Sequence, residues 1–172
     1  MAGAIIILSG IALVQLQRAS DKAKVNKAEV EIEMMGRAIE KIEEDTGNYV
    51  ESLDQLDDAT SPDLSFSPWW GPYVSSLPVN IEDSWGTSYV YFFWLTGKDG
   101  KKEFQIGNYP PGSKGKGWNN GKKVGWKSAP LPPGLWKKLG AEENLSEKGF
   151  LILSRGPDGE MGTEDDIVYG TY

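Results

Sequence analysis

The stretch that decides the fold runs from Val25 to Asp45 and reads VNKAEVEIEMMGRAIEKIEED. It contains no proline, and its apolar side chains recur at steps of three and four residues. These side chains are Val25, Ala28, Ile32, Met35, Ile39 and Ile42. This spacing places them on one face of an α-helix, with Glu, Lys and Arg on the other face. The stretch therefore predicts an amphipathic helix that packs one side against a core.

The helix is expected to continue towards the N-terminus. Residues 1–16 read MAGAIIILSGIALVQL and carry no charge, and neither proline nor glycine separates them from Val25. A continuous helix from Ala2 to Asp45 would have 44 residues and measure about 66 Å. One small domain cannot cover that length, so half of the helix must project into a membrane or against other copies of the chain. Gly47 suits the left-handed position that ends such a helix.

The apolar beginning of the chain is the predicted assembly surface. It is shorter than the roughly 20 residues of a membrane span, and no positive region precedes it as in a signal peptide. An ordinary buried helix or an atypical signal peptide is the alternative interpretation. Gly3, Ser9 and Gly10 suit close helix packing, which favours assembly. The large side chains expected to make this surface are Ile5, Ile6, Ile7, Leu8, Ile11, Leu13 and Val14.

A small antiparallel sheet is predicted after the helix. Four prolines between residues 48 and 79 prevent a long regular element, and Leu53 and Leu56 are expected in a short turn packed on the helix. Aromatic and β-branched residues and a hairpin turn at residues 98–101 predict the strands. These strands are residues 88–94, 102–106, 150–153 and 167–169. The layout is an α+β fold, with a projecting segment at 1–24 and a globular head at 25–172.

A loop rich in lysine and tryptophan, residues 107–140, interrupts this layout. Between Gly107 and Lys127 there are five lysines and no acidic residue. The loop is either a basic aromatic surface for an acidic partner, a glycan or a phosphate, or a solvated loop that its tryptophans pack down. The five lysines are Lys114, Lys116, Lys122, Lys123 and Lys127, and the interleaved tryptophans are Trp118, Trp126 and Trp136.

Composition excludes several classes of site. The 172 residues include no Cys and no His, so disulfides, thiolate nucleophiles, imidazole bases and zinc sites built on nitrogen and sulfur ligands are ruled out. A bound metal would be a hard cation held by oxygen. The net charge of −7 makes general nucleic-acid binding a poor expectation.

The most specific local motif is the acidic loop, residues 154–167, which reads SRGPDGEMGTEDDI. It holds three glycines and five acidic residues. Carboxylates this close together repel, and glycines permit the turns that bring carbonyl oxygens inward, which is the chemistry of a calcium loop. The EF-hand spacing is absent. The alternative is a pair of turns with solvated acidic side chains.

No catalytic motif accompanies these acids. Glycoside hydrolysis by paired carboxylates needs one group with a raised pKa in a cleft, and this loop has no apolar wall. The chain lacks a Gly-x-Ser-x-Gly motif, a P-loop and a dinucleotide fingerprint. We therefore do not expect an enzyme.

Three stretches together resemble the type IV pilin superfamily, and within it the major pseudopilins of type II secretion systems. Residues 39–49, IEKIEEDTGNY, are similar to the family's helix exit. Residues 71–74, GPYV, followed by Leu77-Pro78 and by DSWGTSYVY at 83–91, are similar to its central signature. The acidic loop is similar to its calcium loop.

The resemblance implies a structural function. Such subunits leave the inner membrane and stack by their apolar half-helices into a helical filament, with an inner-membrane assembly platform and minor pseudopilins as partners. Calcium is the implied cofactor, held by side-chain oxygens of Asp158, Asp165 and Asp166 and by carbonyl oxygens of Arg155 and Thr163.

The chain also departs from the family's pattern. Matching Gly47 and Tyr49 to the family's helix exit places the usual mature start about eight residues before Met1, so the family's conserved acid is not assigned here. The helix lacks the family's frequent proline, and residues 97–149 are longer than a pseudopilin needs. A surface type IV pilin for adhesion or motility therefore stays open, as does a membrane-anchored periplasmic binding module that uses the loop at 107–140.

Overall fold

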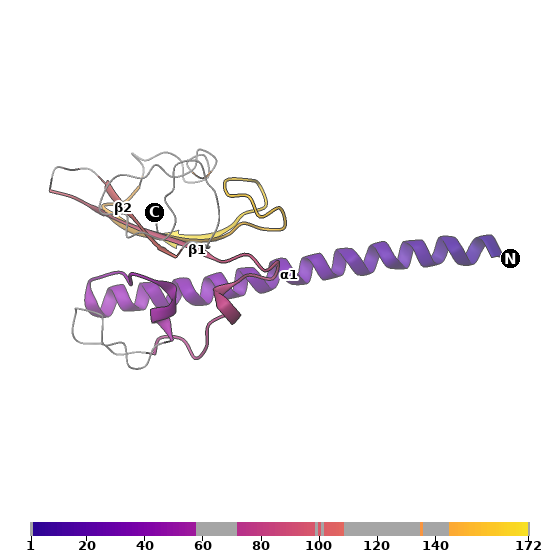
Figure 1. The fold of residues 1–172 in the computed structure, drawn as a ribbon, viewed down its shortest axis with the longest axis horizontal. Helices are drawn as coiled ribbons and strands as arrows, with labels where there is room; N and C mark the ends of the chain where they lie inside the picture. Colours follow the sequence, from indigo (N-terminus) through magenta and orange to yellow (C-terminus); the bar gives the residue numbers. More distant parts are fainter. Residues whose placement is uncertain are drawn as a thin grey trace.

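The computed structural model describes residues 2–57, 72–98, 100, 102–108, 135 and 145–171. Its dominant element is one helix, α1, Ala2–Thr46, of 45 residues. The C-terminal half of α1 packs against the rest of the chain, and the N-terminal half extends beyond it (Figure 1). The predicted continuous helix with a projecting half is confirmed.

The C-terminal end of α1 is fixed by local hydrogen bonds. Gly47 has a φ of 76°, and its N–H donates to the carbonyl oxygen of Glu43 at 2.7 Å. The Thr46 hydroxyl donates to the carbonyl oxygen of Ile42, also at 2.7 Å. The predicted turn at Leu53 and Leu56 is the short 3₁₀ helix η1, Leu53–Leu56, with both leucines buried. A second 3₁₀ turn, η2, Val79–Ile81, precedes the sheet.

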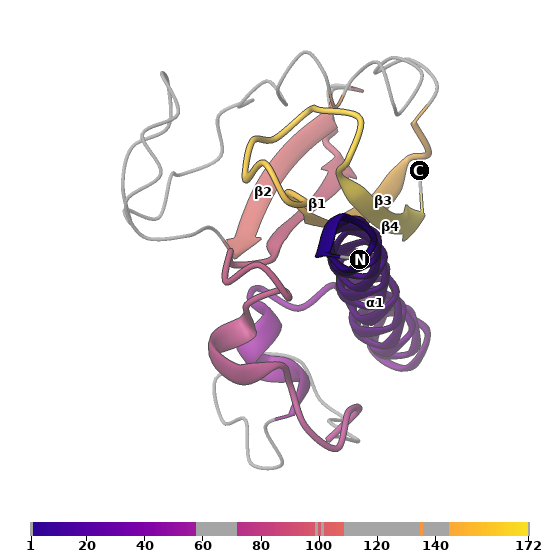
Figure 2. The same ribbon diagram turned by 90° about the vertical axis from the view of Figure 1, so that its right-hand side faces the viewer.

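Four antiparallel strands form one sheet with the spatial order β2-β1-β3-β4. They are β1, Val90–Thr96; β2, Lys102–Asn108; β3, Lys148–Ser154; and β4, Ile167–Thr171. The sheet lies along one side of α1 (Figure 2). All four predicted strands are present, so the α+β prediction is confirmed.

The first strand begins two residues later than predicted. Ser88 pairs with Glu82 in an isolated bridge, and the Tyr89 N–H donates to the carbonyl oxygen of Ile81 at 3.0 Å. These bonds turn the backbone of residues 88 and 89 towards the η2 loop, so β1 starts at Val90. Aromatic content alone did not reveal this competing partner.

The main core lies between α1 and the sheet. The predicted helix stripe is buried from Ala28 to Ile42, whereas Val25 is partly exposed where α1 leaves the head. Opposite this stripe are large aromatic side chains of the sheet. They include Tyr91, Phe93 and Phe150, with the Tyr49 ring 5.7 Å from that of Phe150.

The opposite face of the sheet is buried as well. A second cluster there includes Phe92, Trp94 and Phe104. Leu135 and Leu145, from the long connection between β2 and β3, belong to the same cluster. Because both faces are covered, the side chains of β1 from Val90 to Trp94 are all buried, which explains the unbroken apolar run in this strand.

Candidate assembly helix and acidic loop

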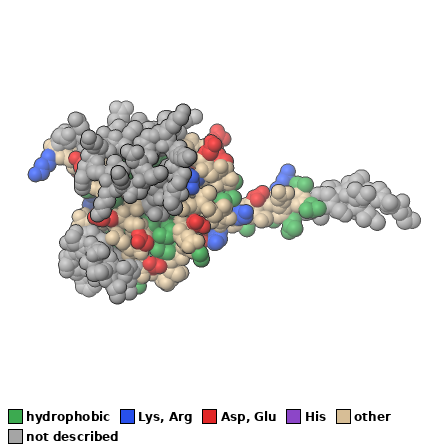
Figure 3. Space-filling model, in the orientation of Figure 1, with side chains coloured by type: hydrophobic (Ala, Val, Ile, Leu, Met, Phe, Trp, Pro, Cys, Tyr) green, Lys and Arg blue, Asp and Glu red, His purple; other side chains and the backbone are tan. Residues whose placement is uncertain are grey.

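The projecting half of α1 exposes large apolar side chains. Leu13 is 66%, Val14 51% and Leu16 71% exposed to solvent, and the hydrophobic side chains in this part of the helix are visible on the surface in Figure 3. Among the described residues, no helix has the length and apolarity that crossing a membrane requires. Leu13, Val14 and Leu16 form an exposed apolar surface on this part of α1.

The remaining predicted assembly residues share this helix. Their backbone lies in α1, and their side chains lie outside the described part of the structure. These residues are Ile5, Ile6, Ile7, Leu8 and Ile11.

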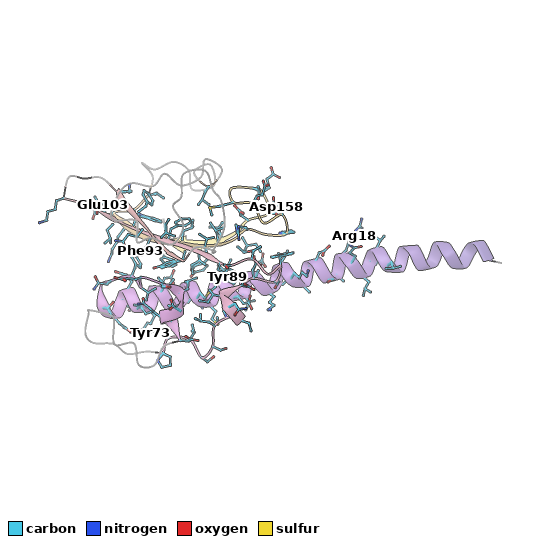
Figure 4. The ribbon with its side chains drawn as sticks, viewed as in Figure 1. Arg18, Tyr73, Tyr89, Phe93, Glu103 and Asp158 are labelled. Atoms are coloured by element: carbon cyan, nitrogen blue, oxygen red, sulfur yellow. The ribbon has the colours of Figure 1, made fainter. Side chains whose placement is uncertain are left out.

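Charged side chains begin where the apolar segment ends. Arg18 lies on the projecting part of α1, away from the head (Figure 4). Lys22 and Lys27 are also exposed, and Lys27 lies 3.5 Å from Glu31 on the next turn. The projecting helix thus passes from an apolar segment into a basic one before it reaches the head.

The acidic loop joins β3 to β4 and is built around glycines in left-handed conformations. Gly156, Gly159 and Gly162 have φ values of 60°, 69° and 91°. A Cβ atom at residue 156 would lie 2.5 Å from the main-chain oxygen of Asp165 and 2.6 Å from its Oδ2 atom. Only glycine therefore lets the two arms of the loop approach this closely.

Asp165 is the centre of the hydrogen bonds in the loop. Its Oδ1 atom accepts from the Thr163 hydroxyl at 2.7 Å, and its Oδ2 atom accepts from the Asp158 N–H at 3.2 Å. The hydroxyl bond from Thr163 is the main cause that lowers the pKa of Asp165 below its ordinary value. The loop therefore favours a charged carboxylate at this position.

The other predicted ligands lie around this centre. The Gly162 N–H donates to Asp166 Oδ2 at 2.7 Å, and Asp166 is buried. Asp158 is exposed at the outer end of the loop (Figure 4). Arg155 reaches the loop through its guanidinium, which donates to the carbonyl oxygen of Gly159 at 3.2 Å. All five predicted residues lie in the loop that joins β3 to β4.

Oxygen atoms are the metal donors that this loop offers, and they suit a hard cation such as Ca²⁺. In the described part of the chain, no group of three or more acidic side chains is arranged to hold a metal ion. The ligand set predicted from the sequence, which combines carboxylate and carbonyl oxygens, stays a prediction.

A buried network beneath the acidic loop was not predicted as a site. Asp83 is only 6% exposed, and its Oδ1 atom accepts from the N–H groups of Trp85 and Thr87 at 3.0 and 2.9 Å. Its Oδ2 atom accepts from the Thr87 hydroxyl at 2.6 Å and from the hydroxyl of Ser154. Ser154 also accepts from the Gly156 N–H at 3.2 Å.

This network connects the motif at residues 83–87 to the first residues of the acidic loop. An aspartate followed by Ser-Trp-Gly-Thr is a signal for a turn in which the carboxylate accepts nearby N–H groups. That signal could have identified the turn. It could not have identified Ser154, which lies 71 residues further along the chain.

The lysine- and tryptophan-rich loop at 107–140 lies almost entirely outside the described residues. The five lysines and three tryptophans named above all fall there. Leu135 is described, and it is buried against the second face of the sheet. The two interpretations of this loop stay predictions.

Comparison with known proteins agrees with the architecture. The family model described as type II secretion system (T2SS), protein G, matches residues 15–127. A type II secretion system core protein G from Xanthomonas campestris pv. campestris is 35% identical over 89 residues, which are 52% of this chain and 57% of that protein. The chain thus aligns with little more than half of this relative. No solved structure matches the chain.

The family model spans most of α1, the Asp83 turn, and strands β1 and β2. The match includes the Asp83 side of the buried network, whereas strands β3 and β4, Ser154 and the acidic loop lie beyond it. The chain belongs to the type II secretion system protein G family.

Proposed function

We propose that the protein is a structural subunit that polymerises through α1 into a helical pseudopilus filament, as in type II secretion. The observation that carries this proposal is the exposed apolar surface of the projecting helix, at Leu13, Val14 and Leu16. Burying such a surface between copies releases about 25 cal/mol for each Å² removed from water. Membership of the protein G family supports the same structural role.

The proposed location and partners of the subunit follow from this mode of assembly. Before assembly the apolar segment is held at the inner membrane, and afterwards it lies inside a periplasmic or extracellular filament. The main partner is a second copy of the chain, and an inner-membrane platform and minor pseudopilins are the further partners. No nucleic acid is expected as a partner, because the chain carries a net charge of −7.

We also propose that the acidic loop binds calcium. Asp158, Asp165 and Asp166 would supply carboxylate oxygens, and Arg155 and Thr163 would supply carbonyl oxygens. Calcium would neutralise the like charges that the loop brings together. The loop's left-handed glycines and the lowered pKa of Asp165 support this proposal.

Electron microscopy of the full chain carrying Leu13→Asp tests the filament proposal. A charge at an exposed helix position leaves the subunit folded but prevents burial between copies, so filaments should disappear. Ser20→Asp is the matched control, because Ser20 is exposed on the same helix and already polar. Filaments that persist with Leu13→Asp would overturn the proposal, and a monomer that never polymerises would favour the anchored binding module.

A further inference from the structure

Asp83 divides its two carboxylate oxygens between two sets of partners. Its Oδ1 atom accepts from the N–H groups of Trp85 and Thr87, at 3.0 and 2.9 Å, and so closes the local turn. Its Oδ2 atom accepts from two hydroxyls, that of Thr87 at 2.6 Å and that of Ser154, the last residue of β3. One oxygen therefore serves the turn, and the other reaches the start of the acidic loop.

The hydrogen bond between Asp83 and Ser154 lies in the interior of the head. Asp83 is only 6% exposed, and Ser154 is fully buried. A hydroxyl that donates to a carboxylate in the interior makes a strong hydrogen bond, because water does not compete for either partner. This bond therefore fixes the position of the Ser154 hydroxyl.

The Ser154 hydroxyl in turn holds a peptide unit at the start of the acidic loop. Its oxygen accepts from the Gly156 N–H at 3.2 Å, two residues further along the chain. This N–H and the Arg155 carbonyl belong to the same planar peptide unit, in which the trans form points them in opposite directions. Holding the N–H on Ser154 therefore fixes the direction of the Arg155 carbonyl, which is one of the predicted cation ligands.

The turn at residues 83–87 also supports the rest of the loop. Gly156 is buried, and a Cβ atom there would lie 2.5 Å from the main-chain oxygen of Asp165 and 2.6 Å from its Oδ2 atom. The Gly156 backbone thus packs closely against the carboxylate at the centre of the loop. A Cβ atom on Gly159 would lie 3.8 Å from the methyl carbon of Thr87. The turn therefore meets the loop at two places, through Ser154 and through this methyl group.

We propose that Asp83 is a positioning residue for the acidic loop. Through the Ser154 hydroxyl it holds the Arg155 carbonyl and the Gly156 backbone in place before a cation binds, so that binding does not have to order them. This inference rests on the proposed calcium binding and adds to it a residue that lies 71 positions before Ser154. Asp83 acts by orientation and not by its charge.

Calcium titration of the full chain in detergent micelles, measured by isothermal titration calorimetry, tests this inference. Removing a group that orients metal ligands costs about 10–100-fold in metal affinity, and we expect a loss of this size for Ser154→Ala. Thr87→Val is the matched control, because it removes the other hydroxyl that donates to Asp83 Oδ2 and keeps the methyl group beside Gly159. Its calcium affinity should match that of wild type.

Asp83→Asn separates orientation from charge. Its amide can donate to the Ser154 oxygen, which still accepts from Gly156, so its calcium affinity should stay close to that of wild type. If Asp83→Asn weakened calcium binding as much as Ser154→Ala, the charge of Asp83 would be the cause and the inference would be wrong. Equal affinities for Ser154→Ala and Thr87→Val would also overturn the inference, while the calcium proposal stood. A wild-type chain that binds no calcium would overturn the calcium proposal, and this inference with it.

A measurement on the calcium-free wild-type chain does not depend on how any variant folds. Hydrogen exchange of the Gly156 amide, followed by NMR in the same micelles, should already be slow, because this N–H is buried and bonded to Ser154. The amide of the exposed Glu160 in the same loop is the reference for fast exchange. If the two amides exchanged equally fast without calcium, Asp83 would not hold the loop in advance, and the inference would be wrong.

Discussion

The aromatic ring of Tyr169 lies where a side chain at residue 36 would be, 2.1 Å from the position of a Cβ atom on Gly36. The glycine therefore opens a slot in α1 that the ring of β4 fills. The Tyr169 hydroxyl then donates to Glu40 Oε1 at 3.1 Å, one turn further along the helix. This contact joins the last strand of the head to the helix that carries the assembly surface.

Replacing Gly36 by alanine should destabilise the head. Alanine in a helix normally stabilises by about 1 kcal/mol relative to glycine. Here the methyl group would displace the Tyr169 ring, so we expect a net loss of about 1–3 kcal/mol in the free energy of unfolding. Urea denaturation measures this loss, with Asn26→Ala as an exposed helix control. A higher free energy of unfolding for Gly36→Ala would contradict the close packing of the Tyr169 ring against Gly36.

Removing the buried carboxylate of Asp83 should lower the free energy of unfolding more than replacing it by an amide. Asp83→Ala leaves two N–H groups and two hydroxyls without their acceptor, and we expect a loss of about 3 kcal/mol. Asp83→Asn keeps one acceptor oxygen, and the hydroxyls of Thr87 and Ser154 can rotate to accept from the new amide, so about 1 kcal/mol is expected. Chemical denaturation measures both, beside the exposed control Asp57→Ala. If Asp83→Ala and Asp83→Asn lowered the free energy of unfolding equally, the hydrogen bonds to Asp83 would not explain its contribution to stability.

The contribution of the acidic loop to the free energy of unfolding should decrease as the pH falls. The Thr163 hydroxyl lowers the pKa of Asp165 in the folded state. The stabilisation is therefore present above the ordinary aspartate pKa of about 4 and is lost as the pH falls through the lower folded value. Thr163→Val should reduce stability at about pH 6 by less than about 1 kcal/mol, because the site is solvent-screened, and have almost no effect at about pH 2.5. Denaturation at the two pH values checks the difference, and a loss independent of pH would contradict it.

Calcium should stabilise the chain through the acidic loop. A ligand at a hundred times its dissociation constant stabilises the folded state by about 2.7 kcal/mol. We expect added Ca²⁺ to raise the melting temperature, EDTA to reverse the rise, and Asp165→Asn to abolish it. The exposed Glu164→Gln in the same loop is the control and should retain the response. If neither calcium nor EDTA changed the melting temperature, the calcium proposal would be wrong, and the acidic loop would be a pair of turns with solvated acidic side chains.

Local patterns predicted the helix and the strands well. The period of three and four residues from Ala28 to Ile42 is a local signal, and the structure buries that face as expected. Gly47 marked the end of α1 because a left-handed residue is itself a local requirement. The acidic loop could be found for the same reason, since its glycines and acids are contiguous.

Features that depend on distant partners could not be predicted. The start of β1 is decided by the bond from Tyr89 to Ile81, which competes with the sheet. The partner of Asp83 lies 71 residues away, and the partner of the Gly36 slot lies on β4. None of these pairings leaves a periodic pattern in the sequence, because each depends on how the chain returns on itself.

The packing of α1 against β3 and β4 has a consequence for how the head folds. The helix contributes residues near position 40 to the core, whereas its partners on these strands lie beyond residue 147. Loop closure over such a separation costs entropy before the contacts form, so the contact order is high and folding is expected to be slow for the size of the head. During synthesis, residues 49–56 and β1 can cover part of the apolar face of α1 early, whereas its contacts with β3 and β4 can form only after the last strand has been made.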